Sequence, residues 1–314
     1  MTLVYADPND PILKSMVGAS VFWNLAETVD YSTLVVVLDE MPGSEAGYDC
    51  IPAECSSASA LLRALNKRYS NKNTLIKAGV KHPMPGNKAP VYGVFERNET
   101  GRLNDSFELS WTVGLVKADR GSETVDQLSA NALVFEGAAD EDSVRELFAE
   151  ELPMLGGTEQ SSWLTNLVKS KLRGIPFGNG QFFIAPQYVP HWRTLKAALS
   201  PLGIILHEIP AMRSEQAVSA VIASLEAYSS KLSDELAEEL SGYNAAQSGD
   251  AKKRKIQQRV VDDRIKKANE QLKIIMTYEE LFDTKMDELR SKFDDAKAAF
   301  ARLSMTRDFI KNQE

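Results

Sequence analysis

The C-terminal third of the chain constrains the fold most, because it contains almost nothing that stops a helix. From 214 to 314 there is no proline, and glycine occurs only at Gly242 and Gly249. Proline breaks helices and glycine weakens them. The segment therefore predicts two long helices, at about 214–241 and 251–309, joined by a loop at the two glycines.

The second predicted helix carries a regular apolar stripe. Its spacing alternates between four and three residues, which is typical of a coiled-coil seam. The members are Val261, Ile265, Ala268, Leu272, Ile275, Phe282, Met286, Leu289, Phe293, Ala296, Phe300 and Leu303. Only Glu279 interrupts the stripe, so we predict one continuous helix that pairs antiparallel with the helix before it. A Thr-x-x-Glu capping box at Thr277 leaves open a third helix that starts there.

The same stripe predicts self-association. The first helix is roughly half as long as the second at 1.5 Å per residue, so it covers only part of the stripe. Leaving large apolar side chains in water costs about 1.5–3 kcal/mol each, and an exposed stripe of this size usually marks an interface. Either the body or another subunit must cover the rest of the stripe. We predict a homo-oligomer, or docking of a protein partner, with an interface formed by Phe282, Met286, Leu289, Phe293, Phe300 and Leu303.

The first 212 residues are predicted to form an α+β body, and residues 213–314 form the helical tail. Hydrophobic residues make up 43% of the chain and charged residues 25%, which indicates a globular protein. Turn-rich sequence separates strand-like segments, which predicts a mostly antiparallel sheet with packed helices. These segments are 75–80, 90–96, 103–116, 132–135, 182–184 and 204–206.

Helices are expected on both sides of the strand-rich region. Residues 11–41 are predicted to be mostly helical, because apolar residues recur there at every fourth position. The run 34–38 fits either a buried strand or a helix, and the flanking acids favour a helix. Further helices are predicted from Ser56 onwards and at about 140–152, 160–173 and 190–200.

The main charge feature is a basic run at the start of the second tail helix. Its members are Lys252, Lys253, Arg254, Lys255 and Arg259. The whole chain has a net charge of −8, so contact with a polyanion would need a local patch such as segment 252–273. The run fits either phosphate contacts or pairing with the acidic run 234–239 across the glycine loop. We favour pairing, because opposite charges beside a helical seam set its register.

Patterns for catalysis and metal binding are weak. The carboxylates at 140–142 and at Glu150-Glu151 are interpreted as solvated helix faces. Gly178-Asn179-Gly180 is interpreted as a turn into the next strand, and no phosphate-loop motif occurs. The two cysteines and the dispersed histidines lack metal-ligand spacing. We expect a non-enzymatic protein without a cofactor or metal, and an enzyme with a site scattered in sequence is a distant alternative.

The sequence also predicts a cytoplasmic location. It contains no run of about 18 apolar residues, which a membrane span requires. Residues 1–7 lack the basic and apolar regions of a signal peptide.

Part of the second half of the chain resembles an uncharacterised family found in phages, plasmids and some bacterial and archaeal genomes. The residues that carry the resemblance are Ser162-Trp163-Leu164, Arg173 and Gly180-Gln181-Phe182-Phe183-Ile184-Ala185-Pro186. The family's strand reads Gly-Gly-x-Tyr-Phe-Val-Pro, so the match is partial. The resemblance implies a phage or mobile-element origin and no activity. We expect an assembly or interaction protein, or alternatively a nucleic-acid-associated protein of phage recombination or replication.

Overall fold

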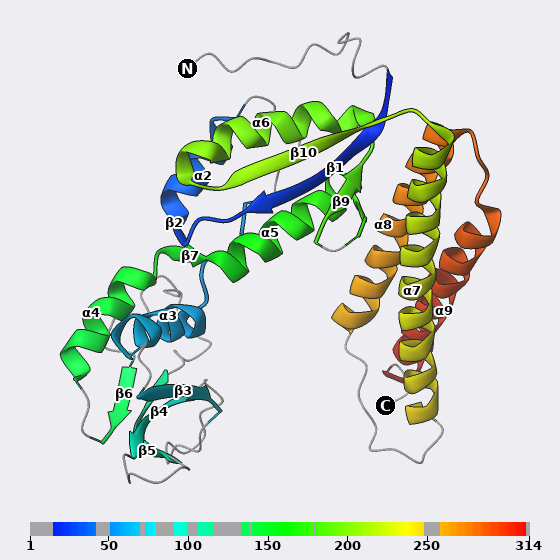
Figure 1. The fold of residues 1–314 in the computed structure, drawn as a ribbon. Coiled ribbons are helices and arrows are strands. Elements are labelled where there is room, and N and C mark those ends of the chain that lie inside the picture. The colour runs from blue at the N-terminus through cyan, green and yellow to red at the C-terminus, as the bar shows by residue number, and fades with distance from the viewer. Residues whose placement is uncertain are drawn as a thin grey trace. The chain divides into compact units, whose positions relative to one another are not determined.

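The computed structural model describes the residues in nine ranges (Figure 1). They are 15–41, 51–69, 73–79, 91–98, 106–115, 133–137, 140–178, 180–247 and 258–311. The fold is α+β, with antiparallel sheets and C-terminal helices that pack together. The chain forms two compact units. Unit 1 comprises Met1–Leu25, Met41–Cys50 and Ser162–Glu314, and unit 2 comprises Ala26–Glu40 and Ile51–Ser161. The division therefore does not fall at the predicted boundary after residue 212.

Unit 2 is built on an antiparallel meander. Its strands lie in chain order and are β3 (Thr74–Ala78), β4 (Val91–Asn98), β5 (Ser106–Leu115) and β6 (Leu133–Glu136). Helices α3 (Ser57–Tyr69) and α4 (Glu141–Glu151) pack on the sheet through a shared apolar core. Trp111 of β5 lies in this core between the rings of Tyr69 and Phe135. The strand-like segments of this region are confirmed.

The expectation of helix across 11–41 is wrong for most of its described residues. Residues Met16–Asn24 form strand β1 and Thr28–Asp30 form β2, which pairs with β7 (Met154–Gly156). Helix begins only with α2 (Tyr31–Asp39), where Asp30 accepts a hydrogen bond from the Thr33 amide at 2.8 Å. The first part of β1 is buried on both faces, so its apolar residues do not alternate, and spacing alone does not separate such a strand from a helix.

The sheet of unit 1 has β1 near its centre. The strand order is β10 (Ile205–Met212), β1, β9 (Phe182–Ile184) and β8 (Ile175–Pro176), and every pair is antiparallel. Gly18 has φ +149°, and a Cβ there would lie 2.3 Å from the carbonyl oxygen of Ile184, so the close approach of β9 requires glycine. Gly178 and Gly180, with φ +73° and +72°, turn the chain from β8 to β9 as predicted.

Helices α5 and α6 accompany this sheet. Helix α5 (Gly157–Ser170) buries Leu164 and Val168. Helix α6 (Val189–Leu199) buries Trp192, whose indole N–H donates to the carbonyl of His207 in β10 at 3.1 Å.

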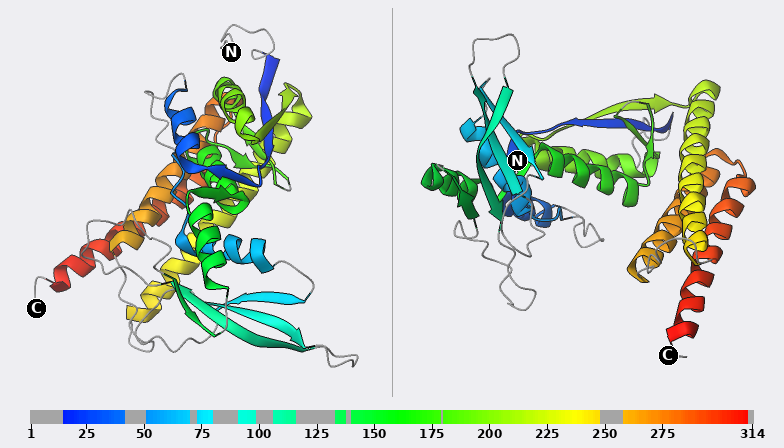
Figure 2. Two further views of the ribbon diagram at one scale, coloured as in Figure 1. Left: turned by 90° about the vertical axis from the view of Figure 1, so that its left-hand side faces the viewer. Right: turned by 90° about the horizontal axis from the view of Figure 1, so that it is seen from below.

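The tail is a bundle of helices α7 (Glu215–Gln247), α8 (Gln258–Phe282) and α9 (Asp287–Lys311), seen side by side in Figures 1 and 2. Helix α8 runs antiparallel to α7, because Arg264 pairs with Glu239 while Gln271 further along bonds to the earlier Ser229. The expected single helix over 251–309 is wrong. Of the two alternatives, the third helix is the one that forms, but it starts at Asp287 and not at Thr277.

The tail shares one apolar core with the sheet of unit 1. This core joins Val17 of β1 and Phe183 of β9 to residues from all three tail helices. The hydroxyl of Tyr278 in α8 donates to the carbonyl of Phe183 at 3.1 Å, and the Tyr278 side chain is fully buried. The tail therefore belongs to unit 1 and is not an appendage.

Candidate functional site

The apolar stripe of the tail is already buried inside one chain. Phe282, Met286 and Leu289 are at most 8% exposed, and Phe293 and Phe300 are 0% exposed. The side chain of Leu303 lies outside the described residues. The break between α8 and α9 folds the stripe back on itself, so it forms the core of the bundle. These five residues are therefore not exposed, although the predicted oligomer interface required them to be. The oligomeric state itself stays a prediction.

The basic segment is only partly described. Lys252 to Lys255 and the side chain of Arg259 lie outside the described residues. Further along α8, Arg264 makes a two-point ion pair with Glu239 of α7, with distances of 2.5 and 2.8 Å. This pair joins the basic segment to the acidic run before the loop, as the intramolecular interpretation expects.

Two further lysines of the basic segment, Lys266 and Lys267, line a groove. The groove lies between α5, α7 and α8 and has a volume of about 1070 Å³. Its cations are Lys169 of α5, Lys231 of α7 and Lys266 and Lys267 of α8. Its acids include Glu235 of α7 and Asp263 and Glu270 of α8. Asp263, Lys266, Lys267 and Glu270 share one face of α8, because residues three, four and seven apart lie on the same side of a helix.

Lys169 occupies the most enclosed position among these lysines. It sits in the last turn of α5 and is half-buried, whereas the other three are exposed. Its Nζ lies 5.8 Å from the ring centre of Phe182 and 5.7 Å from that of Tyr228. Burial lowers the pKa of Lys169, Lys267 lowers it further, and Glu235 acts in the opposite direction. Among the described residues no carboxylate forms an ion pair with it.

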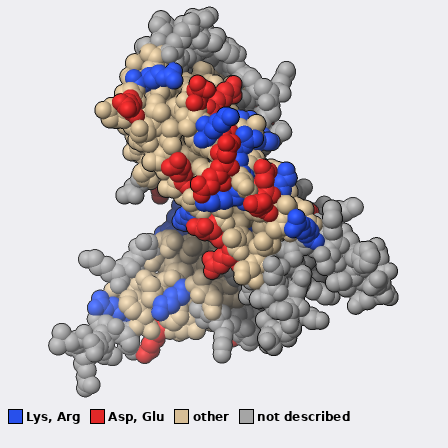
Figure 3. Space-filling view, turned by 90° about the vertical axis from the view of Figure 1, so that its right-hand side faces the viewer, with Lys and Arg blue, Asp and Glu red and all other residues tan. Residues whose placement is uncertain are grey.

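Six charged residues of the groove have no ion-pair partner in the part of the chain that the structure describes. None of Lys231, Glu235, Asp263, Lys266, Lys267 and Glu270 forms an ion pair with another described residue. The groove lining therefore presents both signs of charge to a ligand or partner. Basic and acidic side chains are also intermingled on the face of the molecule drawn in Figure 3.

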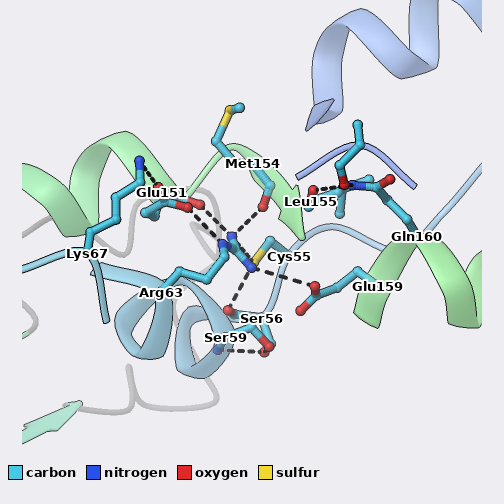
Figure 4. Close-up of polar contacts among 11 residues, drawn as sticks. Cys55, Ser56, Ser59, Arg63, Lys67, Glu151, Met154, Leu155, Glu159 and Gln160 are labelled. Carbon is cyan, nitrogen blue, oxygen red and sulfur yellow. Dashed lines mark hydrogen bonds and ion pairs between the residues drawn. The ribbon is translucent and has the colours of Figure 1, made fainter. Parts of the chain in front are cut away.

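A second polar cluster lies in unit 2 around Arg63 and Glu151 (Figure 4). It shows that the interpretation of Glu150 and Glu151 as a solvated helix face is wrong for Glu151. Glu150 is exposed as expected, but Glu151 is 1% exposed. Glu151 accepts a 2.7 Å hydrogen bond from Arg63 Nε and is also paired with Lys67. Glu151 lies at the C-terminal end of α4, on the side that meets α3, and the packing of the two helices buries it.

The contacts of Arg63 stabilise the packing of α3 against the C-terminal end of α4 and the residues that follow it. The Arg63 guanidinium donates to the backbone carbonyls of Glu151 at 2.9 Å and Met154 at 2.5 Å, and thus holds the chain that leaves α4. It also contacts the sulfur of Cys55 at 3.2 Å. Burial raises the pKa of the Cys55 thiol despite the nearby Arg63, so the thiol is protonated at neutral pH and is a weak nucleophile.

Two further observations concern the described part of the chain. Within it, no group of three or more His, Cys, Asp or Glu side chains is placed to hold a metal ion. No described helix combines the length and the apolar character needed to cross a membrane.

The groove was only partly visible in the sequence. Lys266 and Lys267 fall in the predicted basic segment, but no sequence signal marked Lys169 or Tyr228. They meet α8 only because α5 and α7 pack beside it, and the sequence does not show that packing.

The protein is therefore a two-unit α+β protein. Its three-helix tail shares the core of unit 1 and forms a charged groove together with α5. The chain belongs to the Family of unknown function (DUF6744), whose family model matches residues 16–309. No curated protein and no solved structure matches the chain.

Proposed function

We propose that the chain is a non-enzymatic assembly protein that self-associates through the groove face of unit 1. The observation that carries this proposal is the set of groove charges of both signs that form no ion pair with another described residue. A surface with both signs is able to complement a second copy of itself, and two-fold association is the commonest form of assembly. The interface differs from the one predicted from sequence, because the apolar stripe is used inside the bundle.

A charge-exchange experiment tests the proposal. One variant carries Lys266→Glu and Lys267→Glu, and the other carries Asp263→Lys and Glu270→Lys. Each should be monomeric under conditions in which the unaltered chain is a dimer, because each groove then has one dominant sign and repels its copy. Mixing the two variants should restore a dimer, as measured by sedimentation velocity. High salt should weaken both dimers, because the distance over which exposed charges interact falls from about 10 Å at 0.1 M to about 3 Å at 1 M ionic strength.

The matched control changes charges outside the groove. Lys292→Glu and Asp294→Lys lie at exposed positions of α9 and should leave the association unchanged. A monomeric unaltered chain at concentrations of tens of micromolar, or a mixture that stays monomeric, would rule out association through this face.

Nucleic-acid association is the second candidate. The observation in its favour is the convergence of Lys169, Lys231, Lys266 and Lys267 on one groove. Against it, Glu235, Asp263 and Glu270 lie on the same walls and would repel a continuous phosphate backbone. The phage or mobile-element origin and the cytoplasmic location stay predictions.

A further inference from the structure

Lys169 is held in an arrangement that favours an incoming anion. Its charge is half-buried between the rings of Phe182 and Tyr228, which attract a cation through their faces. Lys267 of α8 lines the same groove and lowers the pKa of Lys169 more than the carboxylate of Glu235 raises it. A bound anion would relieve both the repulsion between the two lysines and the cost of burying one of them.

The lining of the groove selects the kind of anion. Among the described residues of the lining, the available cations are lysines, because Arg264 already forms its two-point pair with Glu239. Lysine binds phosphate as a point charge, whereas planar two-point recognition of a carboxylate is the property of arginine. An extended polyanion along the groove would meet Asp263 and Glu270 as well as the lysines.

We propose that the part of the groove around Lys169, Lys267 and Tyr228 binds the phosphate group of a small phosphate ester. This inference goes beyond the proposed self-association: Lys267 takes part in both, whereas Lys169 and Tyr228 belong to the phosphate site alone. A volume of about 1070 Å³ is slightly larger than the ~300–1,000 Å³ of most small-molecule pockets, so the groove has room for the organic part of such an ester.

Binding is tested on the full chain by calorimetry with three probes: inorganic pyrophosphate, a mononucleotide and a single-stranded oligonucleotide. Pyrophosphate and the mononucleotide should bind. Lys169→Met, which keeps an unbranched apolar stem between the rings, should weaken that binding at least about tenfold, or ~1.4 kcal/mol. The control variant Lys196→Met removes an exposed lysine of α6 outside the groove lining and should bind both probes normally.

The variants also separate this proposal from self-association. Asp263→Lys with Glu270→Lys should abolish the dimer but tighten phosphate binding, because it removes two acids from the groove. Unaltered thermal stability of Lys169→Met would show that loss of binding is not loss of fold.

Three outcomes would overturn the phosphate site. The first is no binding of either small probe at millimolar concentration. The second is equal binding by Lys169→Met and the unaltered chain. The third is binding of the oligonucleotide alone, lost on changing Lys266 and Lys267 but not Lys169, which would assign the groove to nucleic acid.

Discussion

Glu150 and Glu151 are neighbours of the same chemistry, yet one is in water and the other is buried between two cations. Their difference arises from the 100° turn between successive residues of α4, which directs only Glu151 towards α3. Burial would raise the pKa of Glu151, but hydrogen bonds from Lys67 and Arg63 outweigh it and leave the pKa below its ordinary value of 4.5. At the residue scale, partners decide the behaviour of a carboxylate.

The lowered pKa of Glu151 predicts a pH dependence of stability. Because the folded pKa is below the unfolded one, the pair stabilises the fold fully above about pH 4.5. This contribution is lost as the pH falls through the folded pKa of Glu151. Glu151→Gln should lower the unfolding free energy at neutral pH by about 3 kcal/mol, since it leaves the Arg63 and Lys67 charges without their partner. The difference from the unaltered chain should shrink as the pH falls.

The matched control is Glu150→Gln, which removes the neighbouring exposed carboxylate. It should change stability by less than about 0.5 kcal/mol. Urea unfolding at several pH values gives the free energies, and hydrogen exchange of α3 shows whether the loss is local to unit 2. Equal effects of the two substitutions would mean that Glu151 is not buried as a pair.

At the element scale, the turn between α8 and α9 shows how a regular pattern conceals a break. The apolar stripe keeps its spacing through Phe282 and Met286, because both helices direct it into the same core. The break is made by the backbone. Asp283 has φ +51°, and the Thr284 amide bonds back to the Glu279 carbonyl at 3.2 Å, which is a Schellman-type helix end. The carboxylate of Glu279, the one polar residue in the stripe, accepts from the Met286 amide at 2.7 Å.

Substitutions at Asp283 distinguish a turn from a continuous helix. Asp283→Gly should raise the unfolding free energy by about 0.5 kcal/mol. The left-handed backbone costs a residue with a side chain ~1–2 kcal/mol, which glycine avoids. Part of this advantage is offset, because glycine loses more conformational entropy on folding. Asp283→Ala should be neutral or destabilising. In a continuous helix the order would be reversed, with alanine better than glycine by about 1 kcal/mol. Thermal unfolding of the two variants measures this order.

Removal of the Glu279 side chain tests the start of α9. Glu279→Ala should lower stability by about 1 kcal/mol, which is typical for loss of a capping hydrogen bond. Glu280→Ala, at the exposed neighbouring position, is the matched control and should have little effect. Unchanged stability of Glu279→Ala in thermal unfolding would show that its carboxylate does not hold the Met286 amide.

At the scale of the whole molecule, the sequence predicted the class of the fold better than its division into units. Alternating strands such as β5 and proline-free helices such as α7 carry strong local signals, so they were predicted correctly. Strand β1 was missed because it is buried on both faces, and its partners β9 and β10 are far away in sequence. The groove depends on the same long-range packing, so only its α8 wall could be anticipated.

The shared core predicts what happens when the tail is removed. Val17, Ile175 and Phe183 are at most 2% exposed and pack in one cluster with the tail helices. Exposing these three side chains would cost about 1.5–3 kcal/mol each, which is comparable to the ~5–15 kcal/mol that stabilises a typical domain. A chain that ends at Met212 should therefore lose hydrogen-exchange protection in β1 and β9. Helices α3 and α4 should keep theirs, because their core contains no tail residue among those described. Full protection of β9 in the shortened chain would show that the first 212 residues fold without the tail, as the sequence alone had indicated.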